Sequence, residues 1–353
     1  MWKHVSFSES YLKDMVDMTV DNYGLEEAIS HEEFVRHEYL ENPAGSPVIE
    51  LAYDEENSTL AGQYVTCPHL FNVNGSTVKA ILSLNTLTRK EYRGQGIFTK
   101  LAEKAYDNAK HTGYAFCYGA PNPNSHPGFI KKLSFSDLFY MPIYVKILRP
   151  STIAKEKINT FVSALAYPFN VFFLFKDIND SNIVELNKDN YRQMDDFWRA
   201  ISNKYQVIGV RNADYIYYRY LNVPIREYYP FVYLADGKPV AYIVTRIRPV
   251  AGIMTGMIAD FLYVDGYEKE AKKLLKYTNK FIKKKKVGMM GCVMMENSSE
   301  ARILRKCRFF KCPKSILPQP TPMIIRIFDD SIKDSGVLDY KKWFFTAGDY
   351  DVV

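Results

Sequence analysis

Cysteine is scarce in this sequence, and the few cysteines present are not arranged for covalent or metal chemistry. There are five among 353 residues, an odd number, scattered and mostly in apolar runs: Cys67, Cys117, Cys292, Cys307 and Cys312. This pattern indicates reduced thiols in a cytoplasmic protein rather than a disulfide framework. Cys307 and Cys312 have neither a second cysteine pair nor a histidine partner at zinc-ligand spacing, so we predict no metal site.

The sequence also lacks a signal peptide and a strong net charge. Its first six residues contain no apolar core of the kind that a signal peptide needs. The net charge of +6 is mild for this length, so we expect no nucleic-acid partner. The uncharged stretch 158–175 is interrupted by Pro168 and Asn170 and is short for a membrane span. We interpret it as a buried connector between domains or, alternatively, as a patch that contacts a membrane or a lipid-linked substrate.

The usual nucleotide-binding signatures, Gly-x-Gly-x-x-Gly and the Walker A motif, are absent as well. Instead, the stretch Tyr92–Leu101, YRGQGIFTKL, lies between a strand-like run, Val78–Leu87, and a helix-like run, Leu101–Lys110. Two glycines at the entry to a helix allow a sharp turn and leave backbone N–H groups free. These groups, the positive end of the helix dipole and Arg93 can hold a pyrophosphate. The sequence therefore predicts a phosphate-binding strand–loop–helix.

This loop resembles the coenzyme A loop of the GNAT acetyltransferases, Arg/Gln-x-x-Gly-x-Gly/Ala. Here it reads Arg93-Gly94-Gln95-Gly96-Ile97-Phe98, with phenylalanine where the family has glycine or alanine. The resemblance implies acetyl-CoA as the cofactor and a backbone N–H of the pre-loop strand as the group that polarises the thioester carbonyl. The coenzyme-binding residues predicted on this basis are Leu87, Thr88, Arg93, Gly94, Gln95, Gly96, Ile97, Phe98 and Thr99.

The order of elements in the first half is that of the same family. Helices come first, and three or four antiparallel strands then precede the glycine loop, with the strongest hairpin signal at Asn74-Gly75. A helix, the strand Tyr114–Tyr118, a short helix at 127–133 and a final strand, Tyr140–Leu148, follow the loop.

The second half repeats this order weakly. Tyr220–Pro224 echoes Tyr39–Pro43, and strands and helices follow it in the same succession. At the loop position, Asp265–Glu268 has no arginine and places acidic side chains where phosphates would lie, so we expect this copy to have lost coenzyme binding. The fold class that follows is α/β (α+β), with two tandem GNAT-like domains built from mixed, mostly antiparallel sheets flanked by helices.

We divide the chain into four parts: 1–150, a GNAT acetyltransferase domain; 151–178, the apolar connector; 179–330, a degenerate GNAT-like domain; and 331–353, a docked tail. The layout is similar to that of tandem GNAT proteins associated with bacterial surface-polysaccharide synthesis. The tail is aromatic, whereas most tails are polar, which indicates docking. It is either a closing clasp or a segment that places Asp349, Asp351 or the terminal carboxylate in the cleft between the domains.

The usual acid and base of the family are missing. Where the family often has tyrosine, in a Tyr-x-x-x-Gly-Phe frame, this chain has Ile130, and its pre-loop strand offers Ser83 and Asn85 instead of a carboxylate. His126, which titrates near neutral pH, is the first catalytic candidate. The further candidates are Tyr118 as an acid, Asn124, Asp349 and Asp351 for catalysis, and Asn85 and Ser125 for substrate binding.

The predicted function is transfer of an acyl group, acetyl in the first instance, from acyl-CoA to a small-molecule amine. The resemblance suggests an amino sugar or nucleotide sugar as the acceptor, with the second domain shaping its site. An aminoacyl-tRNA-dependent ligase of the peptidoglycan-bridge type, also built from two such halves, is the second hypothesis. A non-catalytic acyl-CoA-binding module is the third, because the expected acid and base are absent.

Overall fold

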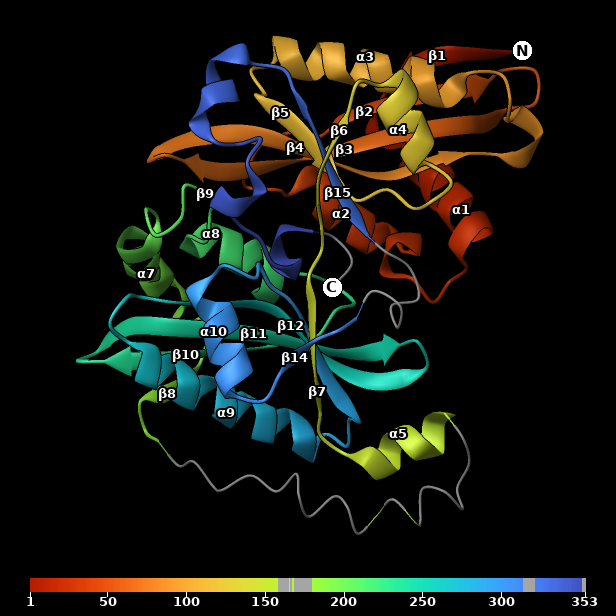
Figure 1. Ribbon diagram of the computed structural model, residues 1–353. Helices are drawn as coiled ribbons and strands as arrows, with labels where there is room; N and C mark the ends of the chain where they lie inside the picture. The colour runs from red at the N-terminus through yellow and green to blue at the C-terminus, as the bar shows by residue number, and fades with distance from the viewer. Residues whose placement is uncertain (158–164, 166, 168–179, 314–320, 351–353) are drawn as a thin grey trace.

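Two β-sheets, here called sheet A and sheet B, face each other in the protein, and the C-terminal tail lies between them (Figure 1). The computed structural model describes residues 1–157, 165, 167, 180–313 and 321–350. α3 (Ile97–His111) covers the outer face of sheet A, and α9 (Glu268–Lys284) covers the outer face of sheet B. A large apolar core fills the space between the sheets and continues between sheet B and α9, and a second, smaller core lies between sheet A and α3.

Sheet A has the strand order β1-β2-β3-β4-β5-β15-β6, and β9 and β16 are attached to it through β3. Its neighbouring strands run antiparallel except for the β4–β5 and β9–β16 pairs. α1 (Leu12–Tyr23), α2 (Glu32–Leu40) and α4 (His126–Lys132) accompany this sheet. Its strands are β1 (Trp2–Ser6), β2 (Val48–Asp54), β3 (Thr59–Val73), β4 (Ser76–Thr88), β5 (Phe116–Gly119), β6 (Ser136–Tyr140), β9 (Val207–Gly209), β15 (Pro322–Ile327) and β16 (Trp343–Phe344).

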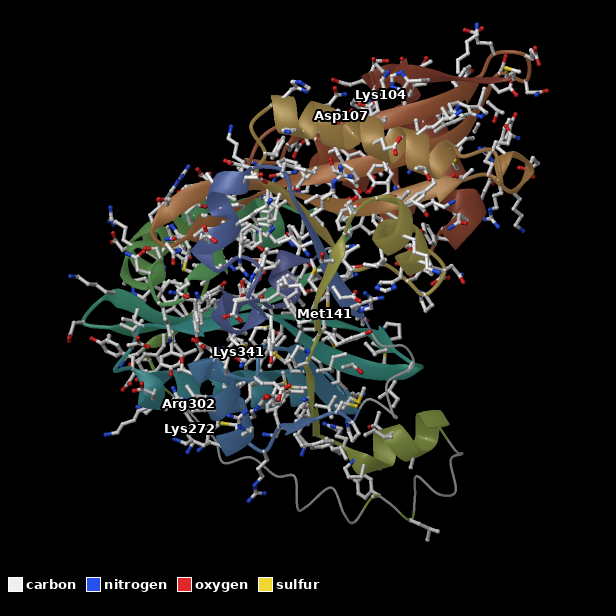
Figure 2. All side chains as sticks on the ribbon, turned by 45° about the horizontal axis from the view of Figure 1, so that its top comes forward. Lys104, Asp107, Met141, Lys272, Arg302 and Lys341 are labelled. Carbon is white, nitrogen blue, oxygen red and sulfur yellow. The ribbon has the colours of Figure 1, made fainter. Side chains whose placement is uncertain are left out.

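α3 illustrates how the local sequence produces this layering. Ile97, Leu101 and Ala105 recur at helical spacing and are buried against sheet A. Lys104 and Asp107 lie on the opposite, exposed face of the helix, and Figure 2 shows both at the outer surface. The alternation of these residue types therefore orients the helix and fixes the position of the glycine loop at its N-terminus.

β3 is a single long strand that continues through Pro68. Pro68 has no N–H group to donate to a neighbouring strand. No ladder bond is lost, because on that edge the pairing of β3 with β2 ends at Thr66 and its pairing with β9 begins at Phe71. The predicted hairpin turn is confirmed: Asn74 and Gly75 both adopt positive φ, at 51° and 87°, between β3 and β4.

Sheet B has the strand order β14-β7-β13-β12-β11-β10-β8, with β12 and β13 parallel. The fold class predicted from the sequence, two mixed sheets flanked by helices, is confirmed. Helices α5 (Pro150–Lys157), α7 (Met194–Ile201), α8 (Ala213–Ile216) and α10 (Ser299–Lys306) surround the sheet. Its strands are β7 (Ile143–Ile147), β8 (Ile183–Glu185), β10 (Tyr228–Ala235), β11 (Lys238–Val250), β12 (Ile253–Tyr263), β13 (Met289–Val293) and β14 (Phe310–Lys311).

Each half of the chain contributes strands to the sheet of the other half. The final strand expected at Tyr140–Leu148 corresponds to β7, which lies between β13 and β14 in sheet B, whereas the preceding strand β6 belongs to sheet A. In return, β15 from the second half lies between β5 and β6 in sheet A. Met141, at the crossing point, lies between the two sheets (Figure 2). The proposed division at residue 150 therefore separates sequence halves that share their sheets.

The apolar connector proposed for 151–178 begins with α5, but residues 158–164, 166 and 168–179 lie outside the described part of the chain. Both interpretations of that segment therefore stay predictions. Within the residues that the structure describes, no helix combines the length and apolar character needed to cross a membrane.

Candidate active site

The candidate site lies where β4 and β5 part. The two strands pair in parallel from Ala80–Phe116 to Ser83–Gly119 and then diverge. A bulge in β4 shifts the register with β3 at this point, and Asn85 within it adopts a φ of 44°. The gap opens a cavity of about 490 Å³, here called the splay pocket. It is lined by Tyr23, Glu27, Ile29, Ser83, Leu84, Asn85, Thr86, Phe98, Gly119, Ala120, Pro121, Asn122, Ser125, Phe129, Arg226, Arg248 and Tyr350.

The predicted glycine loop precedes α3 at this pocket. Gly94 and Gly96 have φ values of +80° and +77°, and Gly96 is the residue before the first turn of the helix. A Cβ on Gly94 would meet no atom within 4 Å, so the loop backbone is open to an approaching group. The first N–H groups of a helix have no intrahelical partners, and here no side chain caps them. Ile97, Phe98 and the residue after them therefore present donors that suit a pyrophosphate, with exposed Arg93 beside them.

Phe98, the residue that departs from the family motif, reaches into the splay pocket. Its ring packs edge-on against Phe129 of α4, with ring centroids 5.3 Å apart. A Cβ on Gly128 would lie 3.0 Å from the Phe98 ring, so the two helices approach closely there. The departure from the motif thus builds an apolar wall for the pocket and leaves the loop geometry intact.

Asn85 and Ser125, the predicted substrate residues, both line the splay pocket. Asn85 Nδ2 donates to Tyr39 Oη at 2.9 Å, whereas its Oδ1 is buried with no hydrogen-bond partner among the described residues. Gln63 Nε2 donates to the backbone oxygen of Asn85 at 3.1 Å and supports the bulge. A buried amide oxygen without a donor is suited to an N–H group of a ligand.

Leu87 and Thr88, predicted to polarise a carbonyl, differ in the direction of their N–H groups. Arg89 N–H donates to Ala61 O at 3.0 Å. Because successive N–H groups of an antiparallel strand alternate sides, Leu87 N–H faces β3, while Thr86 and Thr88 face the side that β5 has left. Of these residues, Thr86 lines the splay pocket, which makes it the better-placed donor.

Two catalytic candidates lie away from this centre. His126 Nε2 is 2.7 Å from Asp137 Oδ1 at the start of α4, and Asn124 is exposed on the preceding loop. Within the part of the chain that the structure describes, neither residue lines the splay pocket. Their proposed catalytic roles therefore gain no support from the geometry.

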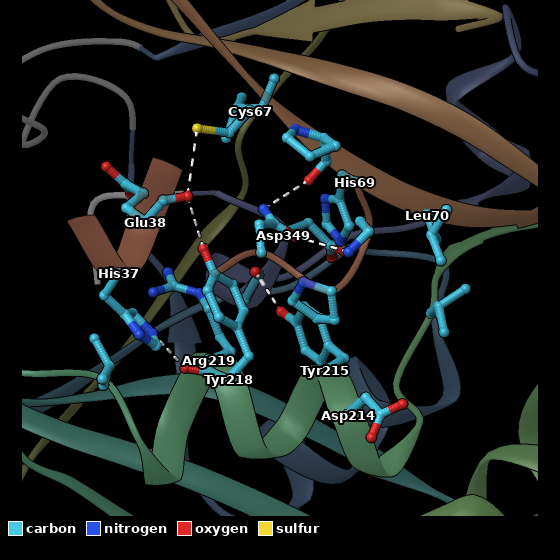
Figure 3. Close-up of a pocket in the computed structure, with 18 of the residues that line it drawn as sticks. His37, Glu38, Cys67, His69, Leu70, Asp214, Tyr215, Tyr218, Arg219 and Asp349 are labelled. Carbon is cyan, nitrogen blue, oxygen red and sulfur yellow. Dashed lines mark hydrogen bonds and ion pairs between the residues drawn. The ribbon is translucent and has the colours of Figure 1, made fainter. Parts of the chain in front are cut away.

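A second cavity, of about 110 Å³, lies between the sheets and is here called the inter-sheet pocket (Figure 3). It shares Leu84 and Tyr350 with the splay pocket, so the two cavities adjoin. Its lining comes from α2, β3, β4, the segment 210–223 and the tail: Phe34, His37, Glu38, Asn42, Pro43, Ala44, Cys67, Pro68, His69, Leu70, Leu82, Leu84, Val210, Asn212, Asp214, Tyr215, Tyr218, Arg219, Val223, Gly348, Asp349 and Tyr350.

Asp349 is buried beside this pocket in an ion pair that holds the tail. Its two carboxylate oxygens accept from Arg211 Nη1 and Nη2, each at 2.7 Å, and Arg211 Nε donates to Asp260 Oδ2 at 2.6 Å. Asp349 Oδ2 also accepts from Thr346 N–H. A carboxylate engaged in this way is suited to clasping the tail rather than to proton transfer. Asp351 lies outside the described residues.

Tyr118 is engaged in the same region. Its hydroxyl donates to Asp349 O at 2.8 Å, and burial raises the pKa of Tyr118 well above its usual value. Since that hydrogen is used, His69 Nδ1, 2.5 Å away, must be the donor to the Tyr118 oxygen. The buried Nε2 of His69 has no hydrogen-bond partner in the described structure. Burial, reinforced by Arg211 and Arg219, lowers the pKa of His69 well below its usual value.

Sequence reasoning missed His69, Phe98 as a pocket wall, and Tyr350. A single histidine in an apolar strand carries no local signal, and only the docked tail brings Tyr350 to both cavities. The hydroxyl of Tyr350 donates to Ala120 O at 3.2 Å, at the end of β5. The described residues contain no group of His, Cys, Asp and Glu side chains that could hold a metal ion.

The strand order, the parted β4 and β5 and the glycine loop define the fold of the GNAT-like N-acyltransferases. Residues 7–136 match the family model described as acetyltransferase (GNAT) domain. No curated protein sequence matches the chain.

Solved structures share the fold at low sequence identity. A probable N-acyltransferase of Enterococcus faecalis V583 has a TM-score of 0.60 and 14% identity, over 93% of this chain and 73% of its own. A GCN5-related N-acetyltransferase from Anabaena variabilis has a TM-score of 0.62 and 12% identity, over 93% and 73%. Saccharomyces cerevisiae N-myristoyltransferase with bound myristoyl-CoA has a TM-score of 0.63 and 11% identity, over 92% and 82%.

Proposed function

We propose that the protein is an acyl-CoA-dependent N-acyltransferase whose reaction takes place in the splay pocket. The observation that carries this proposal is the divergence of β4 and β5 directly beside an open glycine loop at the N-terminus of α3. The loop supplies free N–H groups for a pyrophosphate, and the gap supplies a channel for a pantetheine arm. Bound acyl-CoA would provide an activated acyl group.

The residues around the pocket can then promote attack by an amine on the thioester. Thr86 N–H would polarise the thioester carbonyl, and Asn85 Oδ1 would accept a hydrogen from the amine and orient its lone pair. As the C–N bond forms and the C–S bond breaks, the amine proton passes to the departing sulfur. Tyr350, whose hydroxyl lies at the end of β5, would mediate this transfer in place of the family tyrosine that Ile130 replaces.

The acceptor would enter from the side of the splay pocket that Tyr23, Glu27 and Ile29 share with Arg226 and Arg248. The two arginines come from the second half of the chain, which supports the idea that this half shapes the acceptor site. An amino sugar or nucleotide sugar, and with it a place in surface-polysaccharide synthesis, stays a proposal based on resemblance.

Calorimetric titration with coenzyme A and acetyl-CoA tests this function. Gly96→Asp should abolish binding, because it places a carboxylate where phosphates would lie and removes about three charge-assisted contacts, a loss of roughly a thousandfold or more in affinity. Gly113→Asp is the matched control: Gly113 has a similar φ of +83°, a Cβ added there would have no atom within 4 Å, and the residue lies just beyond the other end of α3.

Acetyl transfer to a panel of amines, including amino sugars, then separates an enzyme from a binding protein. Coenzyme binding with product on at least one amine supports the proposal. Binding without product on any amine would instead indicate a non-catalytic acyl-CoA-binding module. No binding by well-folded protein would overturn both assignments and favour the tRNA-dependent alternative.

A further inference from the structure

The opening between β4 and β5 connects the two faces of sheet A. Ile81 packs in the core under α3, whereas Leu82 and Leu84 belong to the core that faces sheet B. A chain that starts at the glycine loop and passes between the strands therefore emerges on the sheet-B side. There it meets Leu84 and Tyr350, where the inter-sheet pocket begins.

The inter-sheet pocket presents a mainly apolar surface because most of its polar groups are bonded within the protein, with His69 Nε2 as an exception among the described residues. Tyr218 Oη donates to Glu38 O at 3.1 Å, and Tyr215 Oη donates to Gly348 O at 2.6 Å. His37 contacts Glu41 through Nδ1 and Tyr218 O through Nε2, and Arg211 engages the Asp349 carboxylate. The apolar lining residues are Phe34, Pro43, Ala44, Cys67, Pro68, Leu70, Leu82, Leu84, Val210 and Val223. Such a surface suits a hydrocarbon better than an amine, which would need a polar partner.

We propose that the inter-sheet pocket holds the acyl chain of a medium-chain acyl-CoA, about six carbons long, so that the transferred group is longer than acetyl. The length follows from the volume of about 110 Å³, which accommodates about four groups of the size of a water molecule or a methylene. The first two carbons remain in the splay pocket. This assignment rests on the proposed acyl-CoA site and names the class of its acyl donor.

The extent of the pocket along the sheet leaves room for this length. Leu84 pairs with Val65, and His69 lies four residues further along β3. At the usual rise of a strand, the pocket floor from Leu84 to His69 spans about 13 Å. An extended chain of four methylenes advances about 5 Å, so the chain ends well before the buried pair of Arg211 and Asp349.

Calorimetric titration of coenzyme A and its acetyl, butyryl, hexanoyl, octanoyl and myristoyl thioesters, without acceptor, tests the proposal. Each methylene that enters the pocket should raise the affinity roughly fourfold, which gives about 200-fold between acetyl and hexanoyl. Beyond hexanoyl, the gain should stop or reverse, because the pocket is filled.

Variants of Leu82, which lines the inter-sheet pocket and not the splay pocket, provide the matched comparison. Leu82→Phe should reduce hexanoyl-CoA binding to the level of acetyl-CoA, while acetyl-CoA binding stays unchanged. Leu82→Ala should move the preferred length toward octanoyl, and the volume-conserving Leu82→Ile should leave it in place. A merely structural role for Leu82 would weaken all thioesters together, and thermal unfolding of each variant reports on its fold.

The outcomes separate this inference from the proposed function. Equal affinity for all thioesters overturns the acyl pocket and leaves the coenzyme site standing. Length-dependent binding without transfer to any amine supports the acyl pocket and argues against turnover. Leu82 variants that alter the KM of an amine, with unchanged thioester affinities, would show that the acceptor occupies the pocket. Absence of any coenzyme binding overturns both.

Discussion

Arg211 should contribute more to stability than Asp349, although the two residues share one ion pair. Arg211 donates to Asp260 through Nε at 2.6 Å and to Asp349 through Nη1 and Nη2 at 2.7 Å, and all three side chains are fully buried. Arg211→Met therefore leaves two buried carboxylates without their common counter-charge. Asp349→Asn leaves Arg211 paired with Asp260 and keeps an amide oxygen for one guanidinium nitrogen.

The expected losses follow from these contacts. Breaking a buried ion pair by removing one partner costs about 3–5 kcal/mol, which we expect for Arg211→Met. Losing one charge-assisted hydrogen bond costs about 1.5–3 kcal/mol, which we expect for Asp349→Asn. With about 2.1 cal/mol/K of unfolding entropy per residue, the Tm should fall by about 4–7 °C in the first variant and about 2–4 °C in the second.

Urea unfolding followed by tryptophan fluorescence measures this difference. Trp343 belongs to the tail, is fully buried and donates through Nε1 to Val337 O at 2.9 Å, so its emission reports on tail docking. Asp330→Asn is the control, because the Asp330 side chain is 82% exposed and pairs only with Lys333 among the described residues. Equal losses for Arg211→Met and Asp349→Asn would refute the reasoning. Unchanged stability of Asp349→Asn with lost transfer would restore the catalytic role predicted for Asp349.

Two predictions concern pH. Burial, with Arg211 and Arg219, lowers the pKa of His69, so the folded protein keeps it neutral while the unfolded chain takes up a proton below about pH 6.5. The contribution of His69 to the free energy of unfolding is therefore fully present above that pH. Below it, this contribution should fall by up to about 1.4 kcal/mol per pH unit. His69→Asn, which can retain the donor to Tyr118, should remove this part of the slope in urea titrations between pH 7 and 5; an unchanged slope would contradict the assignment. The hydroxyl of Tyr92 holds the Asp54 carboxylate at 2.8 Å and helps to lower the pKa of Asp54 from 3.8 to about 2. That stability is present above pH 3.8 and lost as the pH falls toward 2, so Tyr92→Phe should flatten the Tm profile between pH 4 and 2, and superimposable profiles would refute it.

Features encoded by neighbouring residues could be predicted from the sequence. The turn at Asn74-Gly75 and the glycine loop at 93–99 depend on residues that permit positive φ, and α2 depends on local helical spacing. The weak repeat in the second half could also be predicted from the sequence, since each sheet needs the same succession of strands and helices. These features account for the correct fold class and for the location of the splay pocket.

The exchange of β7 and β15 could not be predicted, because it changes no local pattern. Both strands have the apolar character of a buried strand, and either sheet would accept them. The same limit applies to His69 and Tyr350. Their surroundings are set by contacts between residues far apart in the chain, such as Tyr350 with Ala120 and His69 with Tyr118.

The tail explains why two similar sheets can have different roles. In sheet B, β12 and β13 stop pairing after Ile258 and Cys292, which is the counterpart of the gap in sheet A. Thr346 fills this gap: it bridges to Met294, and its hydroxyl donates to Asp260 Oδ1 at 3.0 Å. A Cβ on Gly348 would lie only 3.0 Å from Asp260 Oδ2, so the tail fits closely.

The second gap is thus occupied by the protein's own chain. The acidic loop Asp265–Glu268, which we expected to reject phosphates, precedes α9 at the same end of sheet B. From this gap the tail continues to Tyr350, which lines both cavities beside the first site. The second half of the chain therefore anchors the segment that completes the cavities beside sheet A, and the Arg211–Asp349 pair couples this segment to it.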